Sequence, residues 1–478
     1  MAVHRLYVLV VVHGFIGFGL NPSTLINYYQ PVLWNFVNQS FYDHYKFTLN
    51  KNQLMSLWSF LAVQMYFGKL LGAVSIGFML ERFGRKTTAM GIRDSIHICA
   101  CAIFVLAFLV NSFELLFLGH FLVGLFIELN AALYIWIGES VAKEISGQIT
   151  MLLGVGMRFG CAVGAAISVP ESFNSSSRWF YFPIACAIFP IVHLGFVCYF
   201  PPSPKYLHMH EQDKATEALK WYQGENVDEQ KFFTEMDCEK ELVSLDQRSV
   251  SRSLYTVFKV KHLRIPFLIC ILSTLCFPVG ALGCIRNQYS SMMLISFGFS
   301  TRNAMYFWVF YNLAGMAVFL CASLLVKAKG RRFLFLSILL LTLGALSSFM
   351  VAASTKKPFS PIFGSVGFLI CMVCVALGIN KLPKLFLVDL CPYGIRAATS
   401  SAAAVCDFSA CILMVLLFPQ LQQVAHQFSY LPIFVLQLIF FAFSYNYLPE
   451  ASRMSASEVA AFFGSKVESE TQPLISRN

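Results

Sequence analysis

Two short basic turns carry the charges best placed to act between helices. The first reads Glu81-Arg82-Phe83-Gly84-Arg85-Lys86 and the second reads Lys327-Ala328-Lys329-Gly330-Arg331-Arg332. Each turn lies between apolar stretches long enough to cross a bilayer, which takes about 20 residues. Arginine binds carboxylates through paired, charge-assisted hydrogen bonds, and other apolar stretches end in the acids Glu139 and Asp389. The pattern predicts ion pairs that join helix ends at one membrane surface.

A second set of polar residues lies inside the apolar stretches. A charge in hydrocarbon costs at least a few kcal/mol unless it meets a partner or a water-filled cavity. One hypothesis is a site for a polar or anionic solute, and the other is structural pairing, such as Arg286 with Asp407. The candidate substrate-binding residues are Asn21, Arg286, Asn287, Gln288, Asn380, Lys384, Asp407 and Phe408.

Composition places the chain among multi-pass membrane proteins. Of its 478 residues, 57% are apolar and 13% are charged, so the soluble classes are excluded. The net charge of +10 reflects cations at the ends of spans, as the positive-inside rule requires, so we expect no nucleic-acid partner. The first apolar run, 6–27, is too long for a signal peptide and is interpreted as a retained span.

The sequence offers little for enzyme chemistry. Fifteen cysteines are present, but none lies in a segment predicted to face outward, so a disulfide framework is not expected. Cys371 and Cys374 have metal-like spacing without a second ligand pair. No phosphate-binding Gly-x-x-x-x-Gly-Lys-[Ser/Thr] loop occurs. We therefore expect no catalytic activity, no metal and no cofactor.

The hydrophobic pattern predicts an all-α protein with both termini in the cytoplasm. A polar connector over 201–262 contains an amphipathic helix at 214–222 that ends near Gly224. Gly378 and Pro383 should break the tenth span. Loops 29–52 and 170–178 should face outward, and they contain the N-glycosylation sequons of Asn38 and Asn174. The twelve predicted spans are 6–28, 53–79, 89–110, 115–138, 148–169, 179–200, 264–296, 304–326, 333–353, 362–388, 397–419 and 429–447.

Three landmarks recur in the second half of the chain. Gly84, Glu139 and Pro201 return as Gly330, Asp389 and Pro449 at an offset of about 250 residues, which indicates a duplicated six-helix unit. The predicted domains are an N-terminal bundle (1–200), a cytoplasmic connector (201–262), a C-terminal bundle (263–447) and a cytoplasmic tail (448–478).

These motifs together resemble the sugar porters of the major facilitator superfamily, and within them the facilitative hexose transporters. The matching elements are Arg82-Phe83-Gly84-Arg85-Lys86, Gly138-Glu139-Ser140, Pro201-Pro202-Ser203-Pro204-Lys205-Tyr206-Leu207, Lys329-Gly330-Arg331-Arg332, Asp389 with Arg396, and Leu448-Pro449-Glu450. The resemblance implies two pseudo-symmetric six-helix bundles that alternate access to a central cavity. It also implies a cytoplasmic gate made of Arg82, Gly84, Arg85, Lys86, Glu139, Gly330, Arg331, Arg332, Asp389 and Arg396.

The chain departs from the family pattern at several positions. Ser146-Gly147 stands where the family usually has an arginine, and Pro202 replaces an acid, so the gate is expected to be weaker. Phe408 replaces the tryptophan that stacks on sugar, and the amides of the seventh span are missing. Proton-coupled relatives have an acid after a Phe-Gly-Tyr in the first span, where this chain reads Phe18-Gly19-Leu20-Asn21-Pro22, which favours uniport.

We expect a facilitative carrier for a hexose or a related small polar metabolite, acting as a monomer in the lipid bilayer. Two alternatives remain at this stage. One is an organic-anion uniporter that uses Arg286 and Lys384, and the other is a sensor that kept the fold and does not transport. The plasma membrane is the expected location. Endosomes or lysosomes are the alternative, because Glu470, Leu474 and Ile475 have the acidic-dileucine spacing that sorting adaptors bind.

Overall fold

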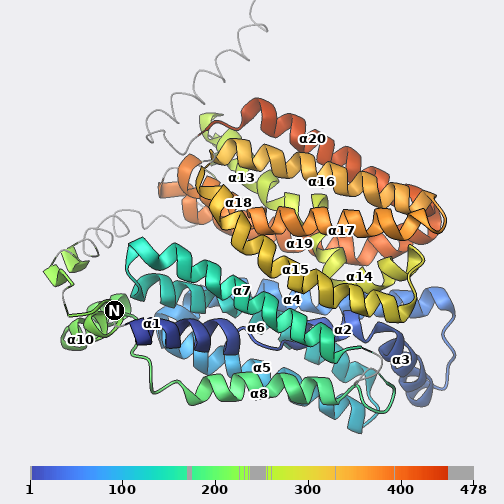
Figure 1. Ribbon diagram of the computed structural model, residues 1–478, viewed down its shortest axis with the longest axis horizontal. Helices are drawn as coiled ribbons and strands as arrows, with labels where there is room; N and C mark the ends of the chain where they lie inside the picture. Colours follow the sequence, from blue (N-terminus) through green and yellow to red (C-terminus); the bar gives the residue numbers. More distant parts are fainter. Residues whose placement is uncertain are drawn as a thin grey trace, which may run out of the picture. The chain divides into compact units, whose positions relative to one another are not determined.

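The computed structural model describes residues 3–169, 175–225, 227–230, 232–234, 236, 255, 257–259, 261–328, 330–391 and 393–450. All regular structure in these ranges is helical, and Figure 1 labels the helices. The chain divides into two compact units. One contains residues 1–239, 287–320 and 415–419, and the other contains 240–286, 321–414 and 420–478. The predicted domain boundaries are not tested by this division and stay a prediction.

The first unit contains the helices of the predicted N-terminal bundle and connector. Most of α14 (Gly283–Ser296) and α15 (Thr301–Ala328) also belong to it. Its other elements are α1 (Val3–Leu9), η1 (Val10–Ile16), η2 (Pro22–Thr24), α2 (Leu25–Tyr28), α3 (Gln30–Tyr45), α4 (Lys51–Phe83), η3 (Thr87–Ile92), α5 (Arg93–Leu109), α6 (Phe113–Ser140), α7 (Lys143–Ile167), α8 (Tyr181–Gly195), α9 (Pro204–His210) and α10 (Gln212–Gln223).

The second unit is built around a core in which α16 packs on α17 and α20, and α13 packs on α18. Its elements are α13 (Lys261–Leu275), η4 (Cys276–Gly280), α16 (Arg331–Ser354), α17 (Phe359–Leu377), α18 (Leu382–Leu390), α19 (Tyr393–Ala425), η5 (His426–Tyr430) and α20 (Leu431–Tyr447).

Eight helical stretches of the described residues are long and apolar enough to cross a membrane. The longest, Ala398–Tyr447, holds two of the predicted spans, because η5 separates α19 from α20. Three shorter apolar helices, His4–Ile16, Leu152–Ile167 and Tyr181–Gly195, coincide with the first, fifth and sixth predicted spans. The all-α membrane architecture is confirmed, whereas the number of twelve crossings stays a prediction.

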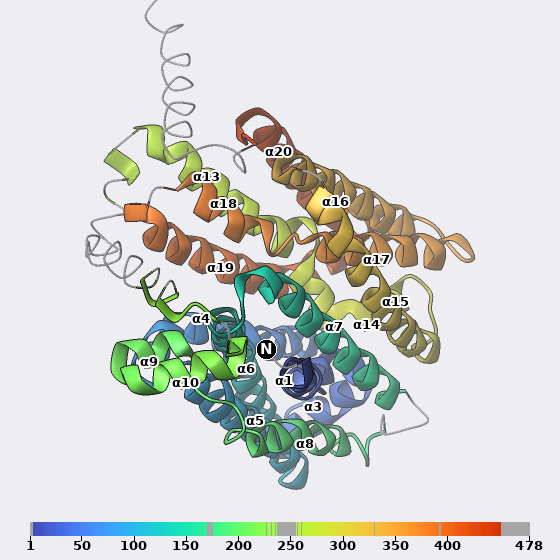
Figure 2. The ribbon, with the colours of Figure 1, turned by 60° about the vertical axis from the view of Figure 1, so that its left-hand side comes forward.

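Helix breaks lie where glycine and proline predict them. α17 ends at Leu377, and Gly378 follows with φ of 100°, a left-handed conformation that favours glycine. Pro383 then stands in the first turn of α18, where its missing N–H costs nothing. In the connector, α10 ends before Gly224, as the sequence predicts, and Figure 2 shows α9 and α10 side by side.

The prediction of a loop over residues 29–52 is wrong for most of that segment. α3 occupies Gln30–Tyr45 and buries Leu33 and Val37 completely. The buried Ser40 hydroxyl donates to the Asn111 carbonyl at 2.6 Å and accepts from the Phe113 N–H at 3.0 Å. These tertiary contacts stabilise a helix that a scan for long apolar runs does not detect.

The closest helix pair in the first unit depends on glycine. A Cβ atom on Gly124 of α6 would lie 1.9 Å from the Met65 carbonyl oxygen of α4, and one on Gly68 would lie 2.0 Å from the Phe121 oxygen. Small residues let membrane helices approach closely where no hydrophobic effect drives them together. The α4–α6 contact therefore requires both glycines.

We expect Gly124→Ala to lower the apparent melting temperature of the purified protein by roughly 2–6 °C, because overpacking costs about 1–3 kcal/mol. Gly77→Ala on α4 is the matched control, since its Cβ would meet nothing within 4 Å. Thermal unfolding followed by size-exclusion chromatography measures both. Equal melting temperatures for the two variants would contradict the packing argument.

Candidate functional site

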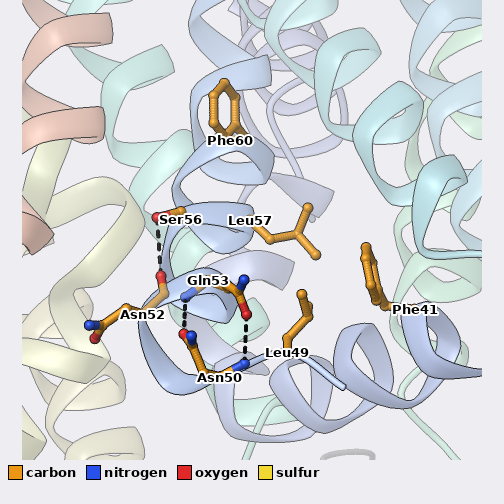
Figure 3. Close-up of a pocket in the computed structure, with 8 residues that line it drawn as sticks. All are labelled: Phe41, Leu49, Asn50, Asn52, Gln53, Ser56, Leu57 and Phe60. Atoms are coloured by element: carbon orange, nitrogen blue, oxygen red, sulfur yellow. Dashed lines mark hydrogen bonds between the residues drawn. The ribbon is translucent and has the colours of Figure 1, made fainter. Parts of the chain in front are cut away.

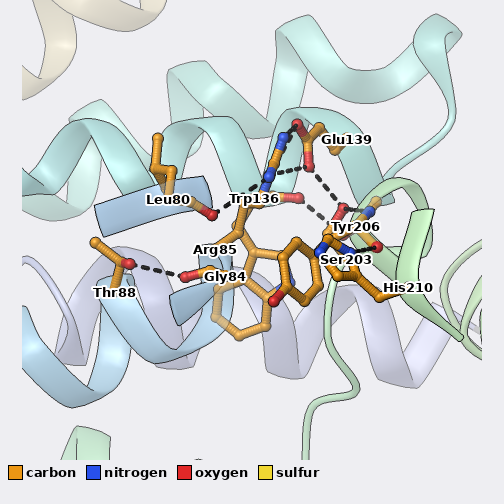
Figure 4. Close-up of polar contacts among 10 residues, drawn as sticks. Leu80, Gly84, Arg85, Thr88, Trp136, Glu139, Ser203, Tyr206 and His210 are labelled. Carbon is orange, nitrogen blue, oxygen red and sulfur yellow. Dashed lines mark hydrogen bonds and ion pairs between the residues drawn. The ribbon is translucent and has the colours of Figure 1, made fainter. Parts of the chain in front are cut away.

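Arg85 and Glu139 form the predicted ion pair. Arg85 follows α4, and Glu139 lies in the last turn of α6. The Arg85 Nε donates to Glu139 Oε2 at 3.0 Å and its Nη2 donates to Oε1 at 3.0 Å, so the contact is bidentate (Figure 4). Both side chains are mostly buried, with 15% and 14% exposure, so solvent screens the pair less than a surface pair.

The connector joins this pair. The Ser203 hydroxyl donates to Glu139 Oε2 at 2.6 Å and also caps α9 by accepting from the Tyr206 N–H. The Tyr206 ring lies 5.6 Å from the Arg85 guanidinium, within the range of a cation–π contact. We name Arg85, Glu139, Ser203 and Tyr206 the Glu139 cluster; it ties α4, α6 and α9 together.

Gly84 is required by its own conformation at this turn. Its φ of 82° with ψ of 165° belongs to a region that almost only glycine occupies. A Cβ there would also lie 3.0 Å from the Tyr206 ring. The turn that follows α4 therefore requires glycine at position 84.

The second basic turn combines an ion pair with a carboxylate that caps a helix. Arg331 donates from Nη1 to Asp389, as predicted. The Glu450 carboxylate accepts from the Arg331 and Arg332 backbone N–H groups, both at 3.0 Å, and thereby caps the positive end of the α16 dipole. Gly330 has an ordinary φ of −64°, so its role differs from that of Gly84. A Cβ on Gly330 would lie 2.5 Å from Glu450 Oε2, so glycine leaves room for the cap.

Three of the remaining predicted gate residues, Arg82, Lys86 and Arg332, belong to the two basic turns. Arg82 is exposed. Lys86 is half-buried, and burial lowers the pKa of its ammonium group. Arg332 donates from Nη2 to the Tyr445 carbonyl at 2.9 Å. Arg396 belongs to α19, and its side chain lies outside the described part of the chain.

The predicted binding residues are divided between the two units, and each is described by its own surroundings. Gln288 is buried, with its oxygen 3.3 Å from His120 Nε2 and its nitrogen 3.4 Å from Met65 Sδ. The Asn21 side chain accepts from the Ser23 N–H at 2.7 Å and so caps η2. Arg286 is buried and donates to the Ala281 carbonyl at 2.8 Å. The others of the set are Asn287, Asn380 and Lys384, which are exposed, Asp407, which is half-buried, and Phe408, which is buried.

Sequence reasoning missed the residues that hold α14 in the first unit. The Asn27 Nδ2 donates to Ser290 Oγ at 2.5 Å, and its Oδ1 accepts from the Ser291 N–H at 3.0 Å. The Tyr289 hydroxyl donates to the Val415 carbonyl at 3.0 Å. Asn312 of α15 lies 3.3 Å from the Tyr28 hydroxyl. We name Asn27, Tyr289, Ser290, Ser291 and Asn312 the α14 clamp; a lone asparagine in an apolar run gave no signal of it.

A surface hollow of about 430 Å³ opens between the end of α3 and the start of α4 (Figure 3). Phe41, Leu49, Leu57 and Phe60 supply most of its lining. Its polar groups are used in capping α4, because Asn50 and Gln53 bond each other's backbone at 2.9 Å. The hollow contains none of the predicted binding residues. Among the described residues, no group of three His, Cys, Asp or Glu side chains is placed to hold a metal.

Comparison with known proteins identifies the family. The model of the family described as "Sugar (and other) transporter" matches residues 7–463. The chain belongs to this sugar transporter family. Its members are transporters, so the family agrees with the expectation of a carrier.

A chicken (Gallus gallus) relative, "Solute carrier family 2, facilitated glucose transporter member 1", is 24% identical over 465 residues, which cover 94% of this chain and 91% of the relative. Mouse (Mus musculus) facilitated glucose transporter member 9 is 22% identical over 474 residues, covering 94% and 83%.

Solved structures agree on the fold of this sugar transporter family member. The proton:xylose symporter XylE bound to 6-bromo-6-deoxy-D-glucose superposes with a TM-score of 0.72 at 16% identity, covering 97% of this chain and 100% of that one. The inward-open form of XylE from E. coli gives 0.70. At this identity the likeness establishes the major facilitator fold alone.

We expect Glu139→Gln and Asp389→Asn to weaken the two ion pairs and open the basic-turn ends of the helices. A loss of about 1.4 kcal/mol corresponds to a tenfold shift in a two-state population, and hydrogen bonds to charged groups contribute about 1.5–3 kcal/mol. An Asn380→Cys reporter, with exposed Cys99, Cys198 and Cys321 changed to serine, should label several-fold faster with an impermeant maleimide applied from the cytoplasmic side.

Glu114→Gln is the control for this experiment. Glu114 pairs with His44, and both side chains are much more exposed than the Glu139 pair, at 41% and 34%. Exposed pairs contribute little to stability, so the reporter rate should not change. Unaltered labelling in both Glu139→Gln and Asp389→Asn would contradict a gating role.

Proposed function

We propose that this multi-pass membrane protein transports a hexose by facilitated diffusion and alternating access. The observation that carries the proposal is the pairing of a basic turn with an acid at matching positions of both halves, Arg85 with Glu139 and Arg331 with Asp389. The family match over residues 7–463 supports it, as do the printed names of the relatives, which are facilitated glucose transporters.

The proposed cycle breaks one of two sets of contacts at a time, and both sets are formed in this structure. The Glu139 cluster and the Arg331–Asp389 pair close the cytoplasmic end when they form, and the α14 clamp closes the opposite end. Each set stabilises one state, so a change that weakens one set shifts the population toward the other state. The side chains proposed to meet the sugar are the uncharged members of the predicted set together with Asn27 and Asn312, whose amides suit hydroxyl groups.

The setting follows from the same proposal. Both termini and both basic turns would lie in the cytoplasm, and the plasma membrane would be the site of action of a monomer. Asn38 has an exposed side chain on α3 and is a proposed glycan site. The second sequon residue, Asn174, and the sorting residues Glu470, Leu474 and Ile475 lie outside the described residues, and their roles stay predictions.

Uptake into proteoliposomes tests the function directly. We expect radiolabelled D-glucose or D-fructose to equilibrate across the membrane without accumulating above equilibrium, even with a pH gradient, and Lys384→Ala to leave this flux intact. Flux of an organic anion that Lys384→Ala abolishes would replace the hexose proposal with the anion carrier. No flux of any tested sugar or anion by folded protein would favour a sensor.

Asn27→Ala should act in the direction opposite to Glu139→Gln. It removes both hydrogen bonds of the Asn27 amide to α14, each worth about 1 kcal/mol, and should favour the state open on the α14 side. The Asn380→Cys reporter should then label more slowly from the cytoplasmic side. Faster labelling in Asn27→Ala would contradict the two-gate scheme. Asn52→Ala, an exposed residue at the start of α4, is the control and should not change the rate.

A further inference from the structure

A buried chain of four polar side chains joins three elements of the first unit. Arg93 and Asp94 begin α5, His193 lies on α8 and His13 lies on η1. Their exposure is 1% or less. None belongs to the two basic turns or to the α14 clamp. Ionisable groups at this depth are costly to keep in a membrane protein, and histidine–carboxylate chains there are typical of proton pathways.

The distances fix where the protons lie. His193 Nδ1 is 2.6 Å from Asp94 Oδ2, and a carboxylate only accepts, so this nitrogen carries a proton. In a neutral ring the other nitrogen then accepts, and His193 Nε2 lies 3.0 Å from His13 Nδ1, which must donate. The second nitrogen of His13 is therefore the position where the chain can take up another proton.

The charges of these four side chains sum to zero when both histidines are neutral. Arg93 Nε donates to Asp94 Oδ1 at 2.9 Å, so one cation cancels one anion. The other titratable groups that face the chain are His97 of α5, stacked on Phe126 at 4.2 Å, and Tyr134 of α6. One more proton would leave a net positive charge in a buried site, and the cation of Arg93 opposes it.

The buried group of four side chains also contacts the break in the first span, through Arg93. Arg93 Nη2 donates to the Gly17 carbonyl at 2.8 Å. The Gly17 N–H bonds to the Val12 carbonyl at 2.7 Å and closes the π-helical turn that contains His13. A Cβ on Gly17 would lie 2.9 Å from His193 Nε2. A charge change in the chain therefore acts on the point where η1 gives way to η2.

We propose that His13, His193 and Asp94 form a proton-binding site that takes up one proton from water, and that Arg93 sets its proton affinity. An N–H bond forms on His13, a hydronium ion becomes water, and nothing is oxidised or reduced. The site lets pH act on the first span with no pH gradient across the membrane, which adds regulation to a carrier that needs no proton drive. Only the transport arm of the test rests on the proposed function.

Tryptophan fluorescence tests the site without any sugar. The Trp136 ring lies 5.0 Å from the His13 ring at 62°, and an imidazolium at that distance quenches indole emission. In the full-length protein in nanodiscs, titrated from pH 8 to pH 4.5, we expect a reversible one-proton loss of emission at the acid end of the range, because burial and the Arg93 cation both oppose the added proton. It should be absent from Trp136→Phe and His13→Gln, and unchanged in His97→Gln, the control on α5. The same titration in His13→Gln as in the unaltered protein would overturn the proposal.

Arg93 gives the sharper comparison. Arg93→Gln leaves the chain with the net charge of Asp94, so the midpoint should move to higher pH by at least one unit, a tenfold change in proton affinity. Arg93→Lys keeps the charge and should stay near the unaltered midpoint. An unmoved midpoint in Arg93→Gln would contradict the role of Arg93. If that variant does not fold, the His13→Gln comparison decides.

The transport arm measures D-glucose exchange at equal pH on both sides. The exchange rate should follow the fluorescence midpoint in the unaltered protein and lose that dependence in His13→Gln. A titrating fluorescence signal with no sugar flux would contradict the proposed function and support the proton site. Sugar flux with no titrating signal would support the proposed function and contradict the proton site.

Discussion

The buried charges of the described residues need polar partners, and that requirement ties distant segments together. The Glu139 carboxylate accepts two bonds from Arg85 and one from Ser203. It thereby connects the first basic turn, the end of α6 and the connector, which lie far apart in sequence. An isolated charge in a medium of low dielectric constant costs several kcal/mol. The ion pairs are therefore conditions for folding as well as candidates for gating.

The two halves meet this requirement in different ways. The first half uses a bidentate arginine, a serine and a glycine with positive φ. The second half pairs Arg331 with Asp389 and adds Glu450, whose carboxylate caps α16 through two backbone N–H groups. The repeat in the sequence thus preserves the position of the charges but not each partner.

The sequence predicts the membrane helices well because hydrophobic length and glycine or proline breaks are local signals. It places α10 and the break before α18 correctly, and it lists the members of both ion pairs among its charged span ends without saying which arginine meets which acid. It misses α3, the α14 clamp and the buried His13 chain, because these depend on which face of one helix meets another. Gln288 illustrates the difference. Its type and position predict a substrate ligand, which stays a prediction, and they give no sign that its amide contacts His120 and Met65. The periodicity of one segment cannot predict a contact of this kind with another segment.

The central claim is that the two charge-paired turns lie on one face of the membrane and close the same end of a carrier. Labelling of Arg82→Cys and Arg332→Cys with an impermeant maleimide in intact cells tests it most directly, with Asn52→Cys as the outward reference. We expect Asn52→Cys to react at once and both turn cysteines to react only after permeabilisation. Reaction of either turn cysteine in intact cells would place the turns on opposite faces, or both outside, and would contradict the account.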